Sequence, residues 1–514
     1  MSERSVLTQA FRTGLRLLVL PVAVALLAIA VASPVAAQGT GTTVYLPVIP
    51  RNQPGLIGDP QWVSPFGIVM YGGLDEATLT RMRSAGSSWV VTMLSWQRVE
   101  SSQGSLNWST YDAEFLAAKN AGMMDVAVLV TGVPEWARGT SYPYPGGGPG
   151  MNVGALASFL GQAAERYDGD GVADAPGRPV VKYWTLFAEP DYCGYVSNGV
   201  CVPRLGEEYK GVWGISGQAY AQMLQVARAA IKAAAPRALV MNGGVAFDYF
   251  THITYENPTR KGIYVRQFMA DVIAAGGGQH MDMLAVHYYP VSMADWAEKL
   301  TQLFGTVYSQ SQSEQMRSLP LISPEMGYWS SEDAGSSERL QAARLVQMFT
   351  RGLSQGVQRL AWFAVFDGPP DVPTESHGLF RGSNPNDPRP AFWAYKTMTT
   401  VLYGFRYEAP LYTEPAGFPS SWDHEAYLFR RAADDARMVV AWANGGAQNP
   451  DGVSELVLDA SRVTVVNMLG LSATNPHVPR SLVVQDGLGA DLDGQANGQI
   501  MLRITQEPVY ILLP

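Results

Sequence analysis

The chain holds few cysteines, few histidines and few charges for its length of 514 residues. Its two cysteines and six scattered histidines form no CxxC or HExxH spacing, so a metal site is not expected. Lys and Arg number 36 against 45 Asp and Glu, which leaves no basic surface for a nucleic acid. Only 16% of residues are charged and 47% are hydrophobic, which excludes a disordered chain. We expect a folded protein that needs no metal or cofactor and binds a neutral or basic ligand.

One long hydrophobic run is present, at residues 17–32, and it follows three arginines. Small residues come next, at positions 35–37. This order is typical of a secretory signal peptide, and we predict that residues 1–37 are removed by cleavage before Gln38. The run is short for a bilayer span, which needs roughly 20 residues, although an uncleaved membrane anchor remains the alternative. We expect a secreted protein that no longer contacts the membrane after cleavage.

The two cysteines, Cys193 and Cys201, stand eight positions apart in a Gly- and Tyr-rich loop. In an exported protein they are expected to form a disulfide. A loop this short contributes roughly 2 to 3 kcal/mol by the chain-entropy model, and the bond mainly stiffens the segment that it closes.

From residue 64 onward, short apolar runs alternate with longer amphipathic ones. Strands are predicted at 67–71, 89–94, 125–130, 181–187, 238–242, 283–287, 319–325 and 360–366. Helices are predicted at 75–85, 111–121, 155–167, 217–235, 264–275, 295–309, 336–355 and 390–402. Eight such pairs favour parallel strands closed into an α/β (β/α)8 TIM barrel. An open doubly wound sheet is the rival, but no GxGxxG or GxxxxGK[ST] motif follows the first strand.

The pattern changes after residue 404, where short strands and turns replace the helical periodicity. We therefore predict a linker at 38–63, a catalytic barrel at 64–404 and a C-terminal all-β, sandwich-like domain at 405–514. This last domain is more simply a structural module packed on the barrel than a glycan-binding one.

Two carboxylates end strands that are otherwise apolar, and they are the first candidates for chemistry. Glu189 follows the fourth predicted strand and Glu325 ends the seventh. These strands lie on opposite sides of an eight-strand ring, and the working face of such a barrel is formed by the loops after the strands. Two carboxylates that face each other across a cleft are what glycoside hydrolysis requires.

With these residues in place, the chain resembles the clan of retaining glycosidases with (β/α)8 barrels that includes families 5 and 39. The match covers residues 66–400, with Glu189-Pro190 after strand four and Val133-Pro134-Glu135-Trp136 after strand three. The resemblance implies that Glu189 is the general acid/base and Glu325 the nucleophile. It also implies that Glu189 is held protonated while Glu325 is ionised.

Further substrate-binding candidates come from the same resemblance. His287 and Tyr289 end strand six and share one face, and a tyrosine here donates a hydrogen bond to the nucleophile in similar enzymes. Trp362 in strand eight resembles the aromatic platform beneath the sugar. Trp136 and Trp96 are secondary candidates, and packing in the core is the competing interpretation for each tryptophan.

The sequence departs from the clan at two positions. The asparagine that usually precedes the acid is Ala188, and strand two lacks the arginine that supports the nucleophile in relatives. Asn242, at the end of strand five, is a hypothetical substitute for the missing amide. The acidic segment 168–174 resembles a Ca²⁺ loop, but an ordinary Asp/Gly turn is the better interpretation.

The sequence therefore predicts a secreted retaining glycosidase that acts on a poly- or oligosaccharide. A catalytically decayed barrel that only binds carbohydrate is one alternative, because of Ala188 and the missing arginine. A transglycosylase that uses the same two carboxylates is the other.

Overall fold

The computed structural model describes most of the chain from residue 63 onward. The described residues are 63–140, 142–246, 264–265, 267–289, 319–369, 372, 375–411, 423–445, 451–470 and 481–514. The predicted signal peptide, the predicted linker up to residue 62 and the helix expected at 295–309 lie outside them.

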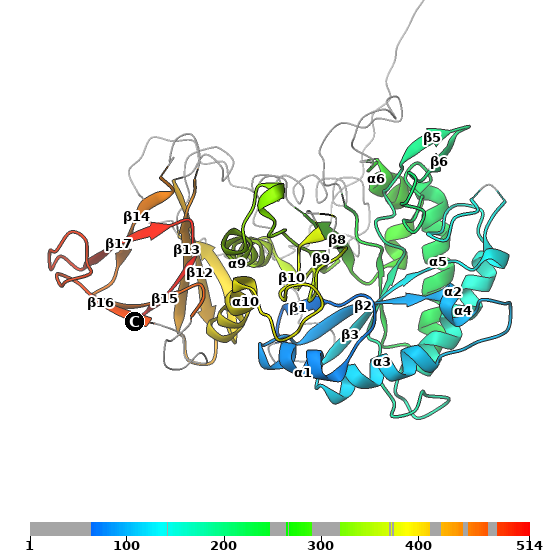
Figure 1. Cartoon of the computed structure of the whole chain (residues 1–514), viewed down its shortest axis with the longest axis horizontal. Helices are drawn as coiled ribbons and strands as arrows, with labels where there is room; N and C mark the ends of the chain where they lie inside the picture. The colour runs from blue at the N-terminus through cyan, green and yellow to red at the C-terminus, as the bar shows by residue number, and fades with distance from the viewer. Residues whose placement is uncertain are drawn as a thin grey trace, which may run out of the picture. The chain divides into compact units, whose positions relative to one another are not determined.

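Eight parallel strands form the central sheet of the protein (Figure 1). They are β1 Phe66–Val69, β2 Trp89–Ser95, β3 Asp125–Thr131, β4 Tyr183–Leu186, β7 Leu239–Asn242, β8 Leu284–Tyr288, β9 Leu321–Met326 and β10 Val357–Trp362. Their order is β7-β4-β3-β2-β1-β10-β9-β8, and parallel bridges Met241–Met283 and Val245–Val286 connect the two outer strands. The sheet is thus a nearly closed barrel, which confirms the predicted fold and not the doubly wound rival.

Helices alternate with these strands along the chain. They are α1 Glu76–Ser84, α2 Trp96–Val99, α3 Ser109–Asn120, α4 Val153–Arg166, α5 Gly217–Ala234, α6 Phe268–Ala274, α9 Glu338–Ser354 and α10 Pro390–Val401, with short 3-10 turns at Glu135–Ala137, Gly277–His280 and Glu332–Ala334. Asp75, Asn152 and Ser337 cap α1, α4 and α9 by accepting a backbone N–H in the first turn. None of the helices within the described residues combines the length and the apolar character that a membrane crossing requires.

The expected helix 264–275 begins later than predicted, at Phe268. Tyr264 instead forms a β-bridge with Tyr192, and the N–H of Val265 donates to the carbonyl of Asp191. This pairing draws the segment before α6 toward the loop after β4.

Strand residues alternate between two apolar layers. Ala127 in β3 and Ala361 in β10 face the barrel interior, whereas their neighbours Val128 and Trp362 pack in the larger cluster that includes the helices. At the opposite end of the barrel from the strand-end carboxylates, buried Arg359 forms a 2.6 Å ion pair with Asp125. Side chains therefore fill the interior of the barrel, and a functional site is expected at the ends of the strands.

A C-terminal β region follows the barrel strands. It consists of β11 Phe405–Pro410, β12 His424–Arg431, β13 Arg437–Ala443, β14 Val453–Asp459, β15 Arg462–Asn467, β16 Ser481–Gln485, β17 Gln499–Thr505 and β18 Val509–Leu513. Six strands pair in the order β11-β12-β13-β18-β15-β16, and β14 pairs with β17. Apolar residues from both sheets share one buried cluster, as in a sandwich. The predicted all-β region is confirmed, whereas the domain limits 64–404 and 405–514 stay a prediction.

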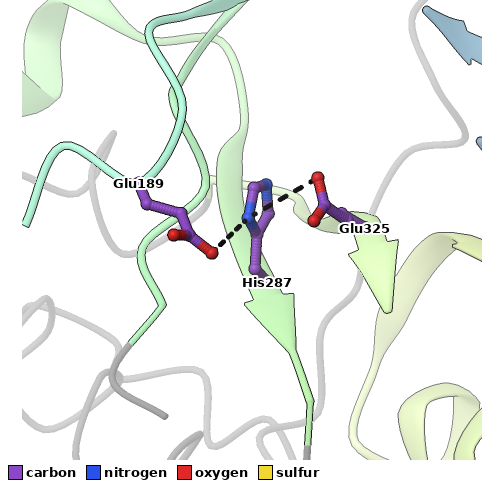
Figure 2. Close-up of side chains that lie close together, drawn as sticks. All are labelled: Glu189, His287 and Glu325. Atoms are coloured by element: carbon purple, nitrogen blue, oxygen red, sulfur yellow. Dashed lines mark hydrogen bonds and ion pairs between the residues drawn. The ribbon is translucent and has the colours of Figure 1, made fainter. Parts of the chain in front are cut away.

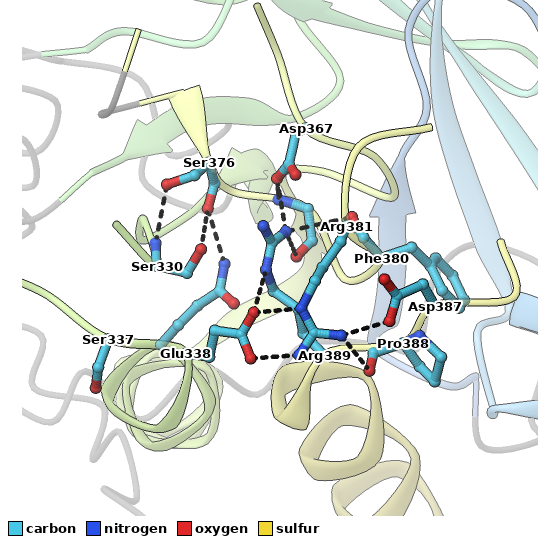
Figure 3. Close-up of polar contacts among 12 residues, drawn as sticks. Ser330, Ser337, Glu338, Asp367, Ser376, Phe380, Arg381, Asp387, Pro388 and Arg389 are labelled. Atoms are coloured by element: carbon cyan, nitrogen blue, oxygen red, sulfur yellow. Dashed lines mark hydrogen bonds and ion pairs between the residues drawn. The ribbon is translucent and has the colours of Figure 1, made fainter. Parts of the chain in front are cut away.

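A network of ion pairs holds the segment that follows β10 (Figure 3). Arg389, which is buried, donates to Asp367 over 2.7 Å and to the carbonyl oxygens of Gly378 and Phe380. It also contacts Glu338 at the start of α9. These bonds place residues 375–380 against the carboxyl end of the barrel.

Candidate active site

Glu189 lies just beyond β4 on a strained stretch of backbone. Its φ is 47° and that of Phe187 is 59°, in the left-handed region that costs a residue with a Cβ roughly 1 to 2 kcal/mol. The N–H of Glu189 donates to the carbonyl of Gly243 over 3.0 Å. Backbone strain of this kind persists only where surrounding contacts enforce it, and it is common at functional sites.

Glu325 lies in β9 and is held by two tyrosines. The Tyr71 hydroxyl donates to Oε2 over 3.0 Å, and the Tyr289 hydroxyl donates to Oε1. Burial, followed by the charge of Glu325, raises the pKa of both hydroxyls well above the usual value, so both remain donors. Tyr71 thus supports the Glu325 carboxylate, although β2 carries no arginine.

His287 lies between the two carboxylates (Figure 2). Its Nδ1 is 3.3 Å from Oε1 of Glu189 and 3.9 Å from Oε2 of Glu325. One ligand atom from each of the three residues lies within 4.8 Å of the other two. The structure therefore brings Glu189, Glu325, His287 and Tyr289 together, although they come from strands remote in sequence.

Two donors on the other side of Glu189 determine its charge. The Tyr264 hydroxyl donates to Oε2 over 2.7 Å, and Lys210 Nζ lies 3.5 Å from the same oxygen. Burial raises the pKa of the Glu189 carboxyl, but the charge of Lys210 and the contacts with His287 and Tyr264 outweigh it, so the pKa is lowered. This direction opposes the expectation that Glu189 is held protonated, and its cause is a lysine that reaches the carboxyl from a loop.

The same three residues form a group that could in principle ligate a metal ion. Their oxygens, however, already accept from Tyr71, Tyr289 and Tyr264, and the Lys210 ammonium lies beside Glu189. Hydroxyl and ammonium donors around the carboxylates suit negative oxygens and oppose a second cation. The donor set therefore favours acid/base or nucleophilic chemistry over metal binding.

The tryptophans lie differently from the expectation. Trp362 is fully buried on the helix side of β10, where its indole N–H donates to the carbonyl of His377. The adjacent ring of Phe363 lies on the interior side, with its centroid 5.8 Å from that of Tyr289. Trp362 is therefore not the platform, because the strand places its side chain on the face opposite the carboxylates.

Trp96 is also fully buried, stacked on Phe159 in the helix layer, and its indole donates to Glu100. This position contradicts a direct substrate contact. Trp136 is half-buried, packs edge-on against Trp96 and donates to the carbonyl of Glu100 over 3.1 Å.

Asn242 does not replace the amide missing at Ala188. Its Nδ2 donates to the carbonyl of Ala285 over 2.8 Å, and its Oδ1 accepts from the N–H of Ala285 over 2.7 Å. Both ends of the amide are therefore used between β7 and β8, where isolated bridges replace a regular ladder. This contradicts the hypothesis, since the side chain is fully buried and its amide is bound to both backbone groups of Ala285.

Several residues of the site were not predicted from the sequence: Tyr71, Lys210, Tyr264, Phe363 and Glu375. Tyr71 follows β1 and continues its alternation, in which every second side chain faces the barrel interior. The alternation in the sequence could therefore have predicted the inward position of Tyr71. Glu375 is half-buried, and burial followed by the charge of Glu325 raises its pKa. Lys210 and Tyr264 lie in connecting segments. Such segments have no sequence periodicity from which the position of a side chain could be predicted.

The predicted disulfide Cys193–Cys201 is confirmed. It closes a hairpin of β5 Tyr195–Ser197 and β6 Val200–Val202, which was not predicted. The hairpin follows Glu189 directly and leads into the segment that carries Lys210.

The acidic segment near α4 forms a turn. Asp174 accepts from the N–H groups of Gly169 and Gly171, and Asp168 and Asp170 each accept from the N–H two residues later. Such bonds are typical of an Asp/Gly turn, as expected.

With this geometry described, the fold can be compared with solved structures. A family 39 glycoside hydrolase from the gut symbiont Bacteroides cellulosilyticus WH2 superposes with a TM-score of 0.60 at 16% identity, over 88% of this chain and 83% of that one. A monomeric beta-xylosidase from Caulobacter crescentus CB15 gives 0.53 at 16% identity, over 88% and 96%. The family 51 alpha-L-arabinofuranosidase from Thermotoga petrophila RKU-1 gives 0.54 at 10% identity, over 88% and 98%.

These three proteins share their fold with the present chain. The likeness establishes the architecture. At such low identity it does not by itself establish an activity. Comparison with models of protein families and with curated proteins gave no match.

Proposed function

We propose that this protein is a secreted retaining glycoside hydrolase that cleaves an O-glycosidic bond in a poly- or oligosaccharide. The single observation that supports this most is the approach of a Glu189 oxygen to within 4.8 Å of a Glu325 oxygen. Retaining enzymes hold their carboxyl groups about 5 to 5.5 Å apart, whereas inverting enzymes need about 6.5 to 9.5 Å to admit a water. The fold shared with known glycoside hydrolases agrees with this proposal.

In the proposed first step, an oxygen of Glu325 attacks the anomeric carbon as the bond to the leaving oxygen breaks. Glu189 gives its proton to that oxygen, and a glycosyl ester on Glu325 results. In the second step, Glu189 takes a proton from a water that attacks the same carbon, and Glu325 leaves as a carboxylate. Tyr71 and Tyr289 orient Glu325 for the attack.

His287, Tyr289 and the half-buried Trp136 remain proposed sugar contacts. The carbohydrate-binding alternative is favoured by Ala188 and by the lowered pKa of Glu189, since a general acid must carry a proton. A transglycosylase would use the same residues but would transfer the sugar to an acceptor hydroxyl instead of water.

Hydrolysis of a panel of aryl glycosides and polysaccharides tests the proposal, with Glu189→Gln and Glu325→Gln as variants. We expect measurable turnover in the parent protein and a loss of about 100-fold or more in each variant. Glu455→Gln, an exposed position in β14, is the matched control and is expected to behave like the parent. Binding of a sugar without any turnover would instead support the carbohydrate-binding alternative.

The stereochemistry of the first-formed product, followed by proton NMR, tests retention separately. A retained anomeric configuration is expected, and inversion would refute the double displacement. Added sugar acceptors would reveal transfer products if the protein is a transglycosylase.

The proposed secretion is supported by the disulfide, which is compatible with an oxidising compartment. N-terminal sequencing of the protein from culture medium should begin at Gln38. Protein retained in cell membranes with its first residues intact would contradict this.

A further inference from the structure

Lys210 is enclosed beside Glu189 rather than extended into solvent, and its side chain is only 16% exposed. Its Nζ lies 3.5 Å from Glu189 Oε2, 3.7 Å from Glu207 Oε1 and 3.3 Å from the Tyr264 hydroxyl. The same ammonium lies 5.1 Å from the centroid of the Tyr192 ring and 5.7 Å from that of Tyr264. Two carboxylates and two aromatic rings thus surround one cation.

The segment that carries Lys210 is itself fixed by a chain of hydrogen bonds. The Tyr192 hydroxyl donates to Glu207 over 2.5 Å and accepts from the N–H of Arg204 over 3.0 Å. The N–H of Val212 donates to the carbonyl of Gly147, and the Cys193–Cys201 disulfide closes the preceding hairpin. The ammonium is therefore held at this position by both sides of its loop, which argues for a specific role.

We propose that Lys210 is a positioning residue that stabilises the carboxylate form of Glu189, favouring the base step of the cycle over the acid step. This inference rests on the proposed function. In the acid step Glu189 must carry a proton, whereas in the second step it must be ionised to accept one. A fixed cation 3.5 Å away favours the ionised form throughout, so Lys210 restricts the acid step to acidic conditions.

Other groups also act on Glu189, and they define the controls. His287 and Tyr264 contact it directly, and Glu325 lies within 4.8 Å. Glu207 competes with Glu189 for the Lys210 ammonium. Outside this set, Tyr209 and Glu375 also interact electrostatically with the same cation.

The test is the pH dependence of kcat/KM for two substrates of the same sugar, one with a dinitrophenyl leaving group and one with an alkyl leaving group. Departure of dinitrophenolate needs no proton, whereas departure of an alkoxide needs the acid. For the alkyl glycoside, kcat/KM declines on the alkaline side of its pH profile, which is called here the alkaline limb. In Lys210→Met this limb should move to a pH about 1 to 3 units higher, because a nearby opposite charge lowers a carboxyl pKa by that amount. Turnover of the alkyl glycoside at pH 7 should rise about tenfold or more, whereas that of the dinitrophenyl glycoside should not.

Lys210→Arg keeps the charge and should keep the parent profile. Glu207→Gln removes the competing carboxylate and should move the limb the opposite way. A merely structural role would lower turnover of both substrates without moving the limb. An unmoved limb in both Lys210→Met and Glu207→Gln would overturn the inference, and it would leave the proposed function intact if the parent is active.

Carbon-13 NMR of glutamate carboxyls gives a readout that needs no turnover. The Glu189 signal, assigned by its loss in Glu189→Gln, should titrate at higher pH in Lys210→Met than in the parent. An unchanged titration would refute the role of Lys210 even in a protein that only binds sugar. Absence of hydrolysis in every variant would instead refute the proposed function.

Discussion

The variant Gly244→Ala tests how strongly the activity of the site depends on the position of His287. Gly244 follows β7 with φ at +71°, and a Cβ built there would lie 2.2 Å from two atoms of the His287 ring. Ordinary contact begins near 3.4 Å, so the ring must retreat by about 1.2 Å or the loop must open. His287 contacts both carboxylates, so we expect Glu189 and Glu325 to shift together with it.

Two costs follow from this substitution. A left-handed alanine loses roughly 1 to 2 kcal/mol of stability, whatever the space around it. Displacement of a catalytic constellation by about 1 Å can lower turnover about 100-fold, because proton transfer and attack depend steeply on distance. We therefore expect a modest loss in the free energy of unfolding and a large loss in kcat/KM.

Gly276→Ala is the matched control for this variant. Its φ is +81°, and a Cβ there meets no heavy atom within 4 Å, so the backbone strain is similar but the clash is absent. Denaturant unfolding should show the strain loss of roughly 1 to 2 kcal/mol in Gly276→Ala and a larger loss in Gly244→Ala, where the clash adds to it, whereas only Gly244→Ala should lose activity. Equal kcat/KM values in the two variants would refute the reasoning about His287.

Three further predictions concern support of the site and stability. Tyr71→Phe removes a hydrogen bond to the Glu325 carboxylate worth about 1.5 to 3 kcal/mol, and kcat/KM should fall about 10- to 100-fold; a fall below about twofold would contradict this. Replacement of Cys193 and Cys201 by Ser should lower the free energy of unfolding by roughly 2 to 3 kcal/mol in denaturant titrations, and an unchanged value would refute it. Glu425→Gln breaks a buried ion pair with Arg351 and should cost about 3 to 5 kcal/mol in the same assay. The double variant that combines Glu425→Leu with Arg351→Met leaves no buried charge unpaired and should cost less, and the opposite order would contradict this reasoning.

The corrections at the site have different physical causes. Trp362 was expected beneath the sugar from its resemblance to the clan's aromatic platform, whereas β10 is Val357–Trp362 and it is Phe363 that faces the interior. A shift of one residue along a strand turns each side chain to the opposite face of the sheet. It is therefore easier to predict that a strand exists than which of its side chains face the interior. Asn242 was placed correctly at a strand end, but its amide bonds Ala285, a partner 43 residues away.

The sequence by itself determined the alternation of strands and helices, the β region after residue 404 and the two carboxylates at the ends of β4 and β9. These features follow from local periodicity and from polar residues at the end of apolar runs, which short segments contain. The tertiary structure alone decided that Tyr71 supports Glu325 and that Lys210 and Tyr264 lie against Glu189. Such contacts join residues 21 to 254 positions apart through loops, and loop conformation depends on what the rest of the chain packs against it.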